Sequence, residues 1–216
     1  MQRLALFDLD DTLIDLRDAF RVWATEFAAD HRLGDGAVDW LIALDGTGLA
    51  HRGEFFARVR ERFALPPEVD ELWAGYRRRM PHLVRCAPEV LASLARLRAD
   101  GWRMGIVTNG TADNQAGKIE HSGLAEVVTG WACSGAEGVS KPDRRLFEIA
   151  AARCGASLAD GGWMIGDSLV KDIGGGGAAG LRTVWVNAGG LAADRVQVDH
   201  VVGHVSEAVA LLAGLR

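Results

Sequence analysis

The sequence predicts an α/β fold in which a mainly parallel sheet carries helices on both faces, together with a separate all-helical stretch. Two observations predict it. Short apolar runs of the buried-strand type alternate along the chain with stretches of helical pattern, which is typical of βαβ units. Between Ile14 and Arg85 this alternation stops and almost no β-rich run occurs, so that part is predicted to fold as helices.

The strands are predicted where apolar runs end, mostly in small or polar residues: Leu4–Phe7, Met104–Val107, Val127–Cys133, Trp163–Ile165, Thr183–Val186 and His200–Val202. The helices between them are predicted at Pro88–Arg98, Ala112–Ser122, Arg144–Arg153, Leu169–Ala179 and Val205–Leu215. Crossovers between parallel strands are right-handed. Ligands in such folds bind beyond the carboxyl ends of the strands, so residues just after each strand are the first candidates for a site.

The helical stretch is predicted to contain four helices: Leu16–Asp30, a segment around Val38–Leu44, Gly53–Phe63 and Val69–Met80. Apolar residues recur near helical spacing in the first of these, and the stripe is expected to serve packing. The chain is therefore divided into a sheet-containing core, residues 1–14 and 86–216, and a helical insert, residues 15–85.

The composition is that of a globular protein, with 216 residues of which 49% are hydrophobic and 25% charged. A net charge of -5 argues against a nucleic-acid binder, which needs a basic face. No apolar run reaches the length of a membrane span, and no signal peptide is expected. The three cysteines form no CxxC pair, so reduced, mostly buried thiols in a cytoplasmic protein are expected.

The first candidate motif is Asp8-x-Asp10-Asp11-Thr12-Leu13, directly after the first predicted strand. Three acids in four residues repel one another and are costly to desolvate unless a positive charge approaches. Two acids at spacing two can face one site, where one ligates Mg²⁺ and attacks phosphorus while the other manages protons. By itself the motif is equally compatible with an acidic turn.

Two further motifs follow. Thr108-Asn109-Gly110 comes after a predicted strand, and its hydroxyl, amide and backbone N–H groups lie just before a helix, where an anion is favoured. Ser140-Lys141-Pro142-Asp143 comes before another helix, with Pro142 expected in its first turn. Lys141 can balance carboxylates there, whereas the other two lysines, Lys118 and Lys171, are compatible with plain surface residues.

The fourth motif is Ile165-Gly166-Asp167-Ser168 with Asp172 following. Asp167 again directly follows a predicted strand, and Asp172 lies about one helical turn after Ser168, so both can face the same site. A run of four glycines, Gly174–Gly177, continues the predicted helix at a cost of roughly 1 kcal/mol per residue against alanine. The helix there either packs very close to the sheet or ends early.

The four motifs, in this order and each at a strand end or helix start, resemble the haloacid dehalogenase-like (HAD) superfamily of hydrolases. The resemblance covers the whole chain and implies a Rossmann-like core with a helical cap inserted after the first motif. It implies that Asp8 is a nucleophile forming an aspartyl-phosphate and that Asp10 is the general acid and base. Mg²⁺ is implied at Asp8, at the backbone carbonyl of Asp10 and at Asp167.

The resemblance further implies that Thr108, Asn109 and Lys141 bind phosphoryl oxygens, while Asp172 supports Lys141 or waters on the metal. A small phosphorylated metabolite is the expected partner, and the oligomeric state is left open. The sequence departs from the family pattern at Asp11, where many members have glycine, and in the length of the glycine run. In the insert, Arg17, Arg21, Trp23, His51 and Arg52 are candidates for substrate contact, although packing or surface charge explains each of them better.

Three alternatives stay open. A phosphomutase of the same fold keeps every site residue, but it needs a bisphosphate activator. A 2-haloacid dehalogenase releases chloride, which needs no proton, and such enzymes typically lack the acid that Asp10 supplies here. A non-catalytic binding protein of this fold would lose nothing on Asp8→Asn. The presence of Asp10 favours a phosphatase.

Overall fold

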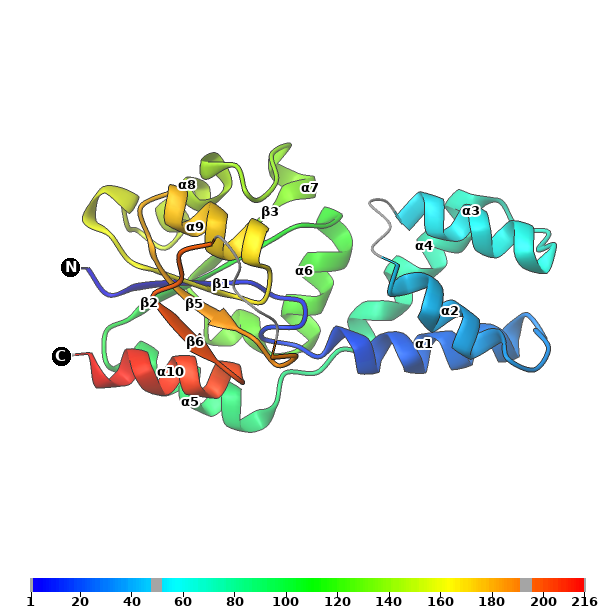
Figure 1. The fold of residues 1–216 in the computed structure, drawn as a ribbon, viewed down its shortest axis with the longest axis horizontal. Helices are drawn as coiled ribbons and strands as arrows, with labels where there is room; N and C mark the ends of the chain where they lie inside the picture. The colour runs from blue at the N-terminus through cyan, green and yellow to red at the C-terminus, as the bar shows by residue number, and fades with distance from the viewer. Residues whose placement is uncertain (1, 48–51, 191–195, 216) are drawn as a thin grey trace. The chain divides into compact units, whose positions relative to one another are not determined.

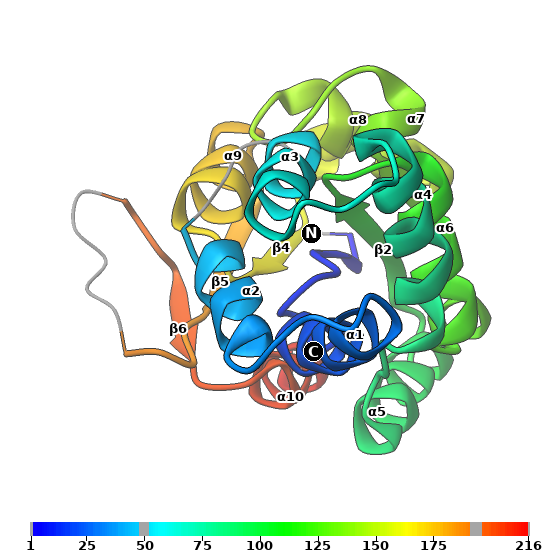
Figure 2. The same cartoon turned by 90° about the vertical axis from the view of Figure 1, so that its right-hand side faces the viewer.

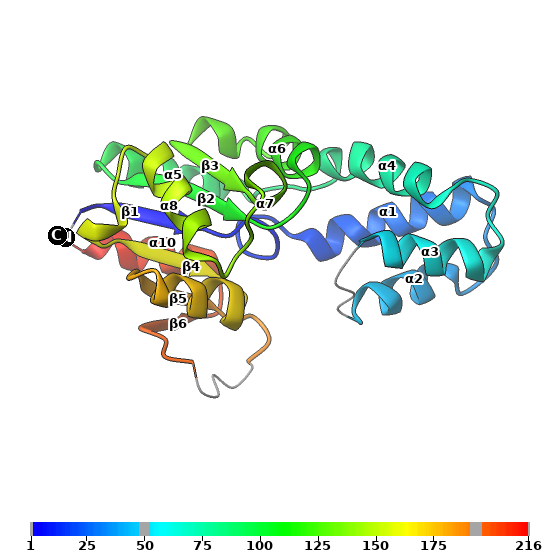
Figure 3. The same cartoon turned by 90° about the horizontal axis from the view of Figure 1, so that it is seen from above.

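The computed structural model describes residues 2–47, 52–190 and 196–215. Within them the chain contains a six-stranded sheet with every neighbouring pair parallel, in the order β3-β2-β1-β4-β5-β6 (Figures 1 and 3). The strands are β1 Leu4–Phe7, β2 Arg103–Thr108, β3 Gly130–Cys133, β4 Trp163–Gly166, β5 Arg182–Val186 and β6 His200–Val202. The predicted α/β class with a Rossmann-like parallel sheet is confirmed.

Helices lie on both faces of this sheet. They are α5 Pro88–Ala99, α6 Ala112–His121, α7 Ser134–Glu137, α8 Arg144–Arg153, α9 Gly175–Ala178 and α10 Val205–Gly214, with short 3₁₀ turns η2 Leu124–Glu126 and η3 Leu158–Asp160. Figure 1 shows α8 and α9 over one face, and α5 and α10 over the other. The central strands β1 and β4 are fully buried, as expected for parallel strands covered on both sides.

Most predicted elements agree with the structure to within a residue or two, and two do not. The strand predicted at Val127–Cys133 begins only at Gly130, because η2 and the turn after it occupy the apolar residues before it. The helix predicted over Leu169–Ala179 is divided into a π-helix η4, Leu169–Gly174, and α9. Pro142 lies before α8 and not in its first turn, since Asp143 caps the helix by accepting the Arg145 N–H.

The glycine run is explained in part by close packing. A Cβ on Gly175 would lie 2.9 Å from Pro142 Cα, and a Cβ on Gly176 would lie 2.7 Å from Met164 Cβ on β4. Both distances are shorter than real Cβ contacts allow. Gly177, by contrast, has open space where its Cβ would be. Of the two predicted alternatives, close packing against the sheet is therefore the one observed: the helix changes from π to α at Gly175 but continues to Ala178.

The chain divides into two compact units, residues 1–15 with 85–216, and residues 16–84. The second unit contains α1 Leu16–Asp30, α2 Ala37–Asp45, α3 Arg52–Phe63, α4 Val69–Arg79 and the 3₁₀ turn η1 Met80–His82. In this unit α1 contacts α2 and α3 contacts α4 (Figure 2). The interpretation of residues 15–85 as a cap on a catalytic core of residues 1–14 and 86–216 stays a prediction.

The helical unit is held together by an aromatic cluster centred on Trp23. Its indole lies 4.9 Å from the Phe27 ring and 5.0 Å from the Tyr76 ring, measured between centroids. The Arg52 guanidinium lies over the rings of Phe20, Phe55 and Tyr76 at 5.0–5.3 Å. Trp23 and Arg52 thus take part in packing within the unit, whereas His51 lies outside the described residues.

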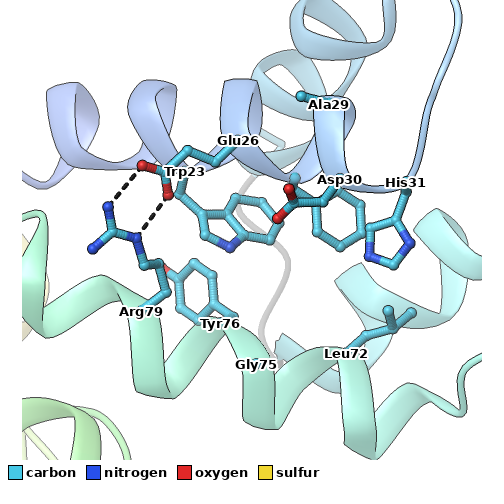
Figure 4. A pocket seen from close by; sticks show the side chains of 10 residues that line it. Trp23, Glu26, Ala29, Asp30, His31, Leu72, Gly75, Tyr76 and Arg79 are labelled. Carbon is cyan, nitrogen blue, oxygen red and sulfur yellow. Dashed lines mark hydrogen bonds and ion pairs between the residues drawn. The ribbon is translucent and has the colours of Figure 1, made fainter.

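A pocket of about 550 Å³ lies between α1 and α4 of this unit. Figure 4 shows Trp23 and Tyr76 at its wall and the ion pair of Glu26 with Arg79 at one end. None of the residues predicted for catalysis or for metal binding lines it.

Candidate active site

The predicted site residues gather at the carboxyl edge of the sheet because neighbouring parallel strands end there. Asp8 follows β1, Thr108 ends β2, and Asp167 follows β4, with β1 lying between β2 and β4. The backbone N–H of Asp8 still donates to the Ile165 carbonyl at 2.8 Å, which fixes the start of the acidic loop against the end of β4.

The centre of the site is a buried lysine between two carboxylates. Lys141 Nζ lies 2.6 Å from Asp8 Oδ1 and 2.7 Å from Asp172 Oδ1. Asp172 is fully buried, and Lys141 and Asp8 are 4% and 8% exposed. Charged groups survive at this depth only when they are paired, because each costs several kcal/mol to desolvate. The predicted balance of Asp8 by Lys141 and the support of Lys141 by Asp172 are both present as ion pairs.

Gly166 makes room for this arrangement. A Cβ at this position would collide with the carboxylate of Asp172, so only glycine lets that side chain pass beneath the strand end. The other Asp172 oxygen, Oδ2, accepts the backbone N–H of Ser168 at 3.0 Å. The Gly-Asp-Ser-x-x-x-Asp motif is thus held together by contacts among its own residues, and these place Asp167 beside Asp172.

Asn109 holds the backbone of Lys141 from both sides. Its Nδ2 donates to the Lys141 carbonyl at 3.1 Å, and its Oδ1 accepts the Lys141 N–H at 2.9 Å. This pair of bonds ties the end of β2 to the loop before α8. The Asn109 side chain was predicted to contact phosphate, but in this structure both of its polar groups are engaged with Lys141.

Asp10 is held by α6, through two residues that the sequence analysis did not select. Lys118 Nζ lies 2.8 Å from Asp10 Oδ1 and 3.0 Å from Oδ2, and Gln115 Nε2 donates to Oδ2 at 3.1 Å. Gln115 Nε2 also lies 2.5 Å from Thr108 Oγ1. Lys118 is 2% exposed, so the interpretation of it as a plain surface lysine was wrong. Lys171, interpreted in the same way, is exposed.

Burial is the largest influence on the pKa values of the charged groups in the site. Burial raises the pKa of Asp8 to about 8, against the opposing effect of Lys141. Burial, together with Asp172 and Asp11, raises the pKa of Asp167 to about 6. Burial lowers the pKa of Lys141, but its two carboxylate partners outweigh this and raise it above its ordinary value. Buried carboxylates whose pKa values are raised by burial and by specific charged neighbours are typical of functional sites.

Comparison with known proteins agrees with this geometry. The family model for haloacid dehalogenase-like hydrolases matches residues 2–180. A glyceraldehyde 3-phosphate phosphatase of Pyrococcus abyssi is 31% identical over 204 residues, which cover 88% of this chain and 83% of that protein.

The chain belongs to the haloacid dehalogenase-like hydrolases.

Other relatives of this hydrolase span different shares of its length. A phosphoserine phosphatase of Thermus thermophilus is 38% identical over 122 residues, covering 56% of this chain and 47% of that protein. The structure of YfnB from Bacillus subtilis shares the fold with a TM-score of 0.79 at 23% identity, over 98% of this chain and 99% of that one. Solved 2-haloacid dehalogenases also share the fold.

The hydrolase offers a donor set suited to a hard divalent cation. One carboxylate oxygen from each of Asp8, Asp167 and Asp172 lies within 4.8 Å of the others. Carboxylate oxygens are the ligands that Mg²⁺ prefers. Because Asp172 already pairs with Lys141 and Ser168, the acids available to an ion are Asp8, through its second oxygen, and Asp167.

The three cysteines, Cys86, Cys133 and Cys154, are buried free thiols, as predicted. Among the described residues, no helix is both long and apolar enough to cross a membrane.

Proposed function

We propose that this hydrolase is a Mg²⁺-dependent phosphatase that hydrolyses a small phosphomonoester through an aspartyl-phosphate on Asp8. The observation that supports it best is the buried triad of Asp8, Lys141 and Asp172 beside Asp167, with Asp10 two residues after the nucleophile. A nucleophilic carboxylate, a fixed cation, a metal-binding acid and an acid–base group are the components that this two-step chemistry requires.

In the first step the carboxylate of Asp8 attacks phosphorus. The bond between phosphorus and the ester oxygen breaks. Asp10, which must enter this step protonated, gives its proton to that oxygen, so the alcohol leaves neutral and Asp10 becomes the carboxylate that Lys118 stabilises. In the second step Asp10 takes a proton from water, whose oxygen attacks phosphorus. The bond between phosphorus and the Asp8 oxygen breaks, so inorganic phosphate is released and the carboxylate of Asp8 is restored.

Thr108 through its hydroxyl and Lys141 through its ammonium bind the phosphoryl oxygens in this proposal. Asn109 contributes its backbone N–H, while its side chain holds Lys141 in place. Asp8, the Asp10 carbonyl and Asp167 would hold Mg²⁺, which supplies positive charge to the phosphoryl group as negative charge develops on it. Residues 15–85 are assigned as the cap that excludes water during the reaction.

A small phosphorylated metabolite is the proposed substrate. Relatives are named for glyceraldehyde 3-phosphate and for phosphoserine, both of them phosphomonoesters of small molecules. A dehalogenase reaction gives Asp10 no task, because chloride leaves without a proton. Here Asp10 is held by two dedicated donors, which argues for a leaving group that needs protonation.

The test is release of inorganic phosphate from a panel of phosphorylated metabolites, with Mg²⁺ and with excess EDTA. Wild type is expected to hydrolyse some of them only with Mg²⁺, and Asp8→Asn and Asp10→Asn are expected to abolish turnover. The matched control is Glu120→Gln on the exposed face of α6, which is expected to keep wild-type rates. Phosphate transfer to a second sugar carbon without release would support a phosphomutase instead, and chloride release a dehalogenase.

A further inference from the structure

Two buried residues of helix α6, Lys118 and Gln115, hydrogen-bond to the side chain of Asp10. Lys118 contacts both carboxylate oxygens, at 2.8 and 3.0 Å, and Gln115 donates to one of them at 3.1 Å. The two donors lie three residues apart, and at that spacing helical side chains project from the same face. We infer that Lys118 and Gln115 are positioning residues, which fix the carboxylate of Asp10 for both of its proton transfers.

The burial of Lys118 indicates an electrostatic purpose. Its side chain is 3% exposed, whereas that of Asp10 is 24% exposed. A buried ammonium costs several kcal/mol in lost hydration, and an apolar residue of similar volume often serves stability equally well or better. Helix packing alone therefore gives no reason for a lysine here. The ion pair of Lys118 with Asp10 leaves part of the Asp10 side chain exposed to solvent. A group that exchanges protons with substrate and water needs this exposure.

Gln115 provides a second, independent link. Its Nε2 bridges Asp10 and Thr108, so the acid–base group and a proposed phosphate ligand are held at a fixed spacing. Gly110 makes room for it, since a Cβ there would lie 2.8 Å from Gln115 Cγ. In the Thr108-Asn109-Gly110 motif, the glycine thus leaves space for the Gln115 side chain to reach back to Thr108 at the end of β2.

Without these donors the Asp10 side chain is free to rotate on the loop after β1. Misplacing a reacting group by about 1 Å can cost roughly 10²-fold in rate. The inference rests on the proposed function, in which Asp10 protonates the leaving alcohol. The need for that proton depends on the leaving group: an alkoxide requires it, whereas p-nitrophenolate leaves without it. A positioning role therefore has a kinetic signature that loss of stability does not share.

The experiment compares kcat/KM for p-nitrophenyl phosphate and for glycerol 1-phosphate in Lys118→Met and Gln115→Met. Since kcat/KM reports formation of the aspartyl-phosphate, it isolates the first step. We expect a loss of about 10²-fold for glycerol 1-phosphate and less than about tenfold for p-nitrophenyl phosphate. The control is Ile119→Ala, a buried neighbour on the same helix, which is expected to leave the ratio of the two values unchanged.

The second step provides another readout, because Asp10 then acts as a base for either substrate. Each variant is expected to release a burst of p-nitrophenol equivalent to the enzyme, followed by slow turnover. Equal losses for both substrates, no loss, or a gain with glycerol 1-phosphate would each overturn the inference. If Lys118→Met does not fold, as judged by circular dichroism, Gln115→Met decides. If glycerol 1-phosphate is not hydrolysed, an alkyl phosphate that wild type does hydrolyse in the metabolite panel takes its place. Wild type that releases phosphate from no member of that panel would refute the proposed function, and the inference with it.

Discussion

Two adjacent glycines in α9 are expected to respond in opposite directions to the same added methyl group. Gly176→Ala places a Cβ 2.7 Å from Met164 Cβ and 2.9 Å from Met164 Cγ, whereas Gly177→Ala meets nothing within 4 Å. The first contact is about 1 Å shorter than an ordinary carbon–carbon spacing. Its partner is fixed to the backbone of the central strand β4, so it cannot swing aside as the end of a flexible side chain can.

The magnitudes follow from these two environments. Overpacking a close contact in a core costs about 1–3 kcal/mol, from which the gain in helix propensity subtracts up to about 1 kcal/mol. At Gly177 only the gain applies, so stability is expected to rise by about 0.5–1 kcal/mol. For a domain of this size, each kcal/mol shifts the melting midpoint by about 2–4 °C.

The assay is urea or thermal unfolding of both variants beside wild type, followed by circular dichroism. The free energy of unfolding should fall for Gly176→Ala and rise for Gly177→Ala. If both rise, α9 does not approach β4 as closely as the structure shows. If both fall, the helical conformation at Gly177 is incorrect. Either result would refute the explanation given for the glycine run.

Three further predictions concern the site. Asn109→Ala removes both hydrogen bonds on the Lys141 backbone, worth about 1 kcal/mol each, so unfolding free energy and phosphatase kcat/KM should fall together; a variant as stable as wild type would contradict this. Lys141→Met leaves two buried carboxylates without their cation and should cost about 3–5 kcal/mol, part of which Asp172→Asn should restore in a double-mutant cycle; additive losses would refute the pairing. The pKa of Asp167 is raised from 3.8 to about 6, so between these pH values the native state holds a proton that the unfolded state has already lost. The contribution of this group to the stability of the metal-free protein therefore decreases as the pH rises from 3.8 to about 6, and it is constant above that. Since Mg²⁺ must displace that proton, the rise in melting midpoint on adding Mg²⁺ should be larger at about pH 7 than at about pH 5, and a pH-independent rise would argue against Asp167 as a ligand.

The strands and helices could be predicted because the core follows simple periodicity. Leu4–Phe7 and Arg144–Arg153 agree with the prediction to the residue. The exceptions have local causes. Val127 and Val128, predicted as the start of a strand, instead donate their backbone N–H groups to the Leu124 carbonyl just after η2, and a short apolar run cannot distinguish such a turn from a strand. Which of the glycines pack against Pro142 or Met164 could not be predicted, because a contact between distant segments leaves no mark in the local sequence.

The site could be predicted only as far as its residues follow strand ends. Asp8, Thr108 and Asp167 were found in this way, and Lys141 by its place before a helix. Lys118 and Gln115 were missed because they lie within α6, where a lone lysine resembles a solvated residue. The available signal was their spacing of three, on the face that also carries the buried Ile119.

The charge balance of the site shows why both lysines are buried there. Four acids and two lysines lie in contact or close proximity at the strand ends: Asp8, Asp10, Asp167 and Asp172, with Lys118 and Lys141. Their formal sum is -2 when all are ionised, and Asp11 adds to the negative potential at Asp167. Both lysines are already paired with carboxylates, so even with Lys141 in contact with the phosphoryl oxygens, the charge of an incoming phosphate dianion is left uncompensated. Burial is the main cause of the raised pKa values of Asp8 and Asp167, and the neighbouring carboxylates add to it. A divalent cation bound by these two acids would restore neutrality, and its binding should therefore precede that of the phosphomonoester.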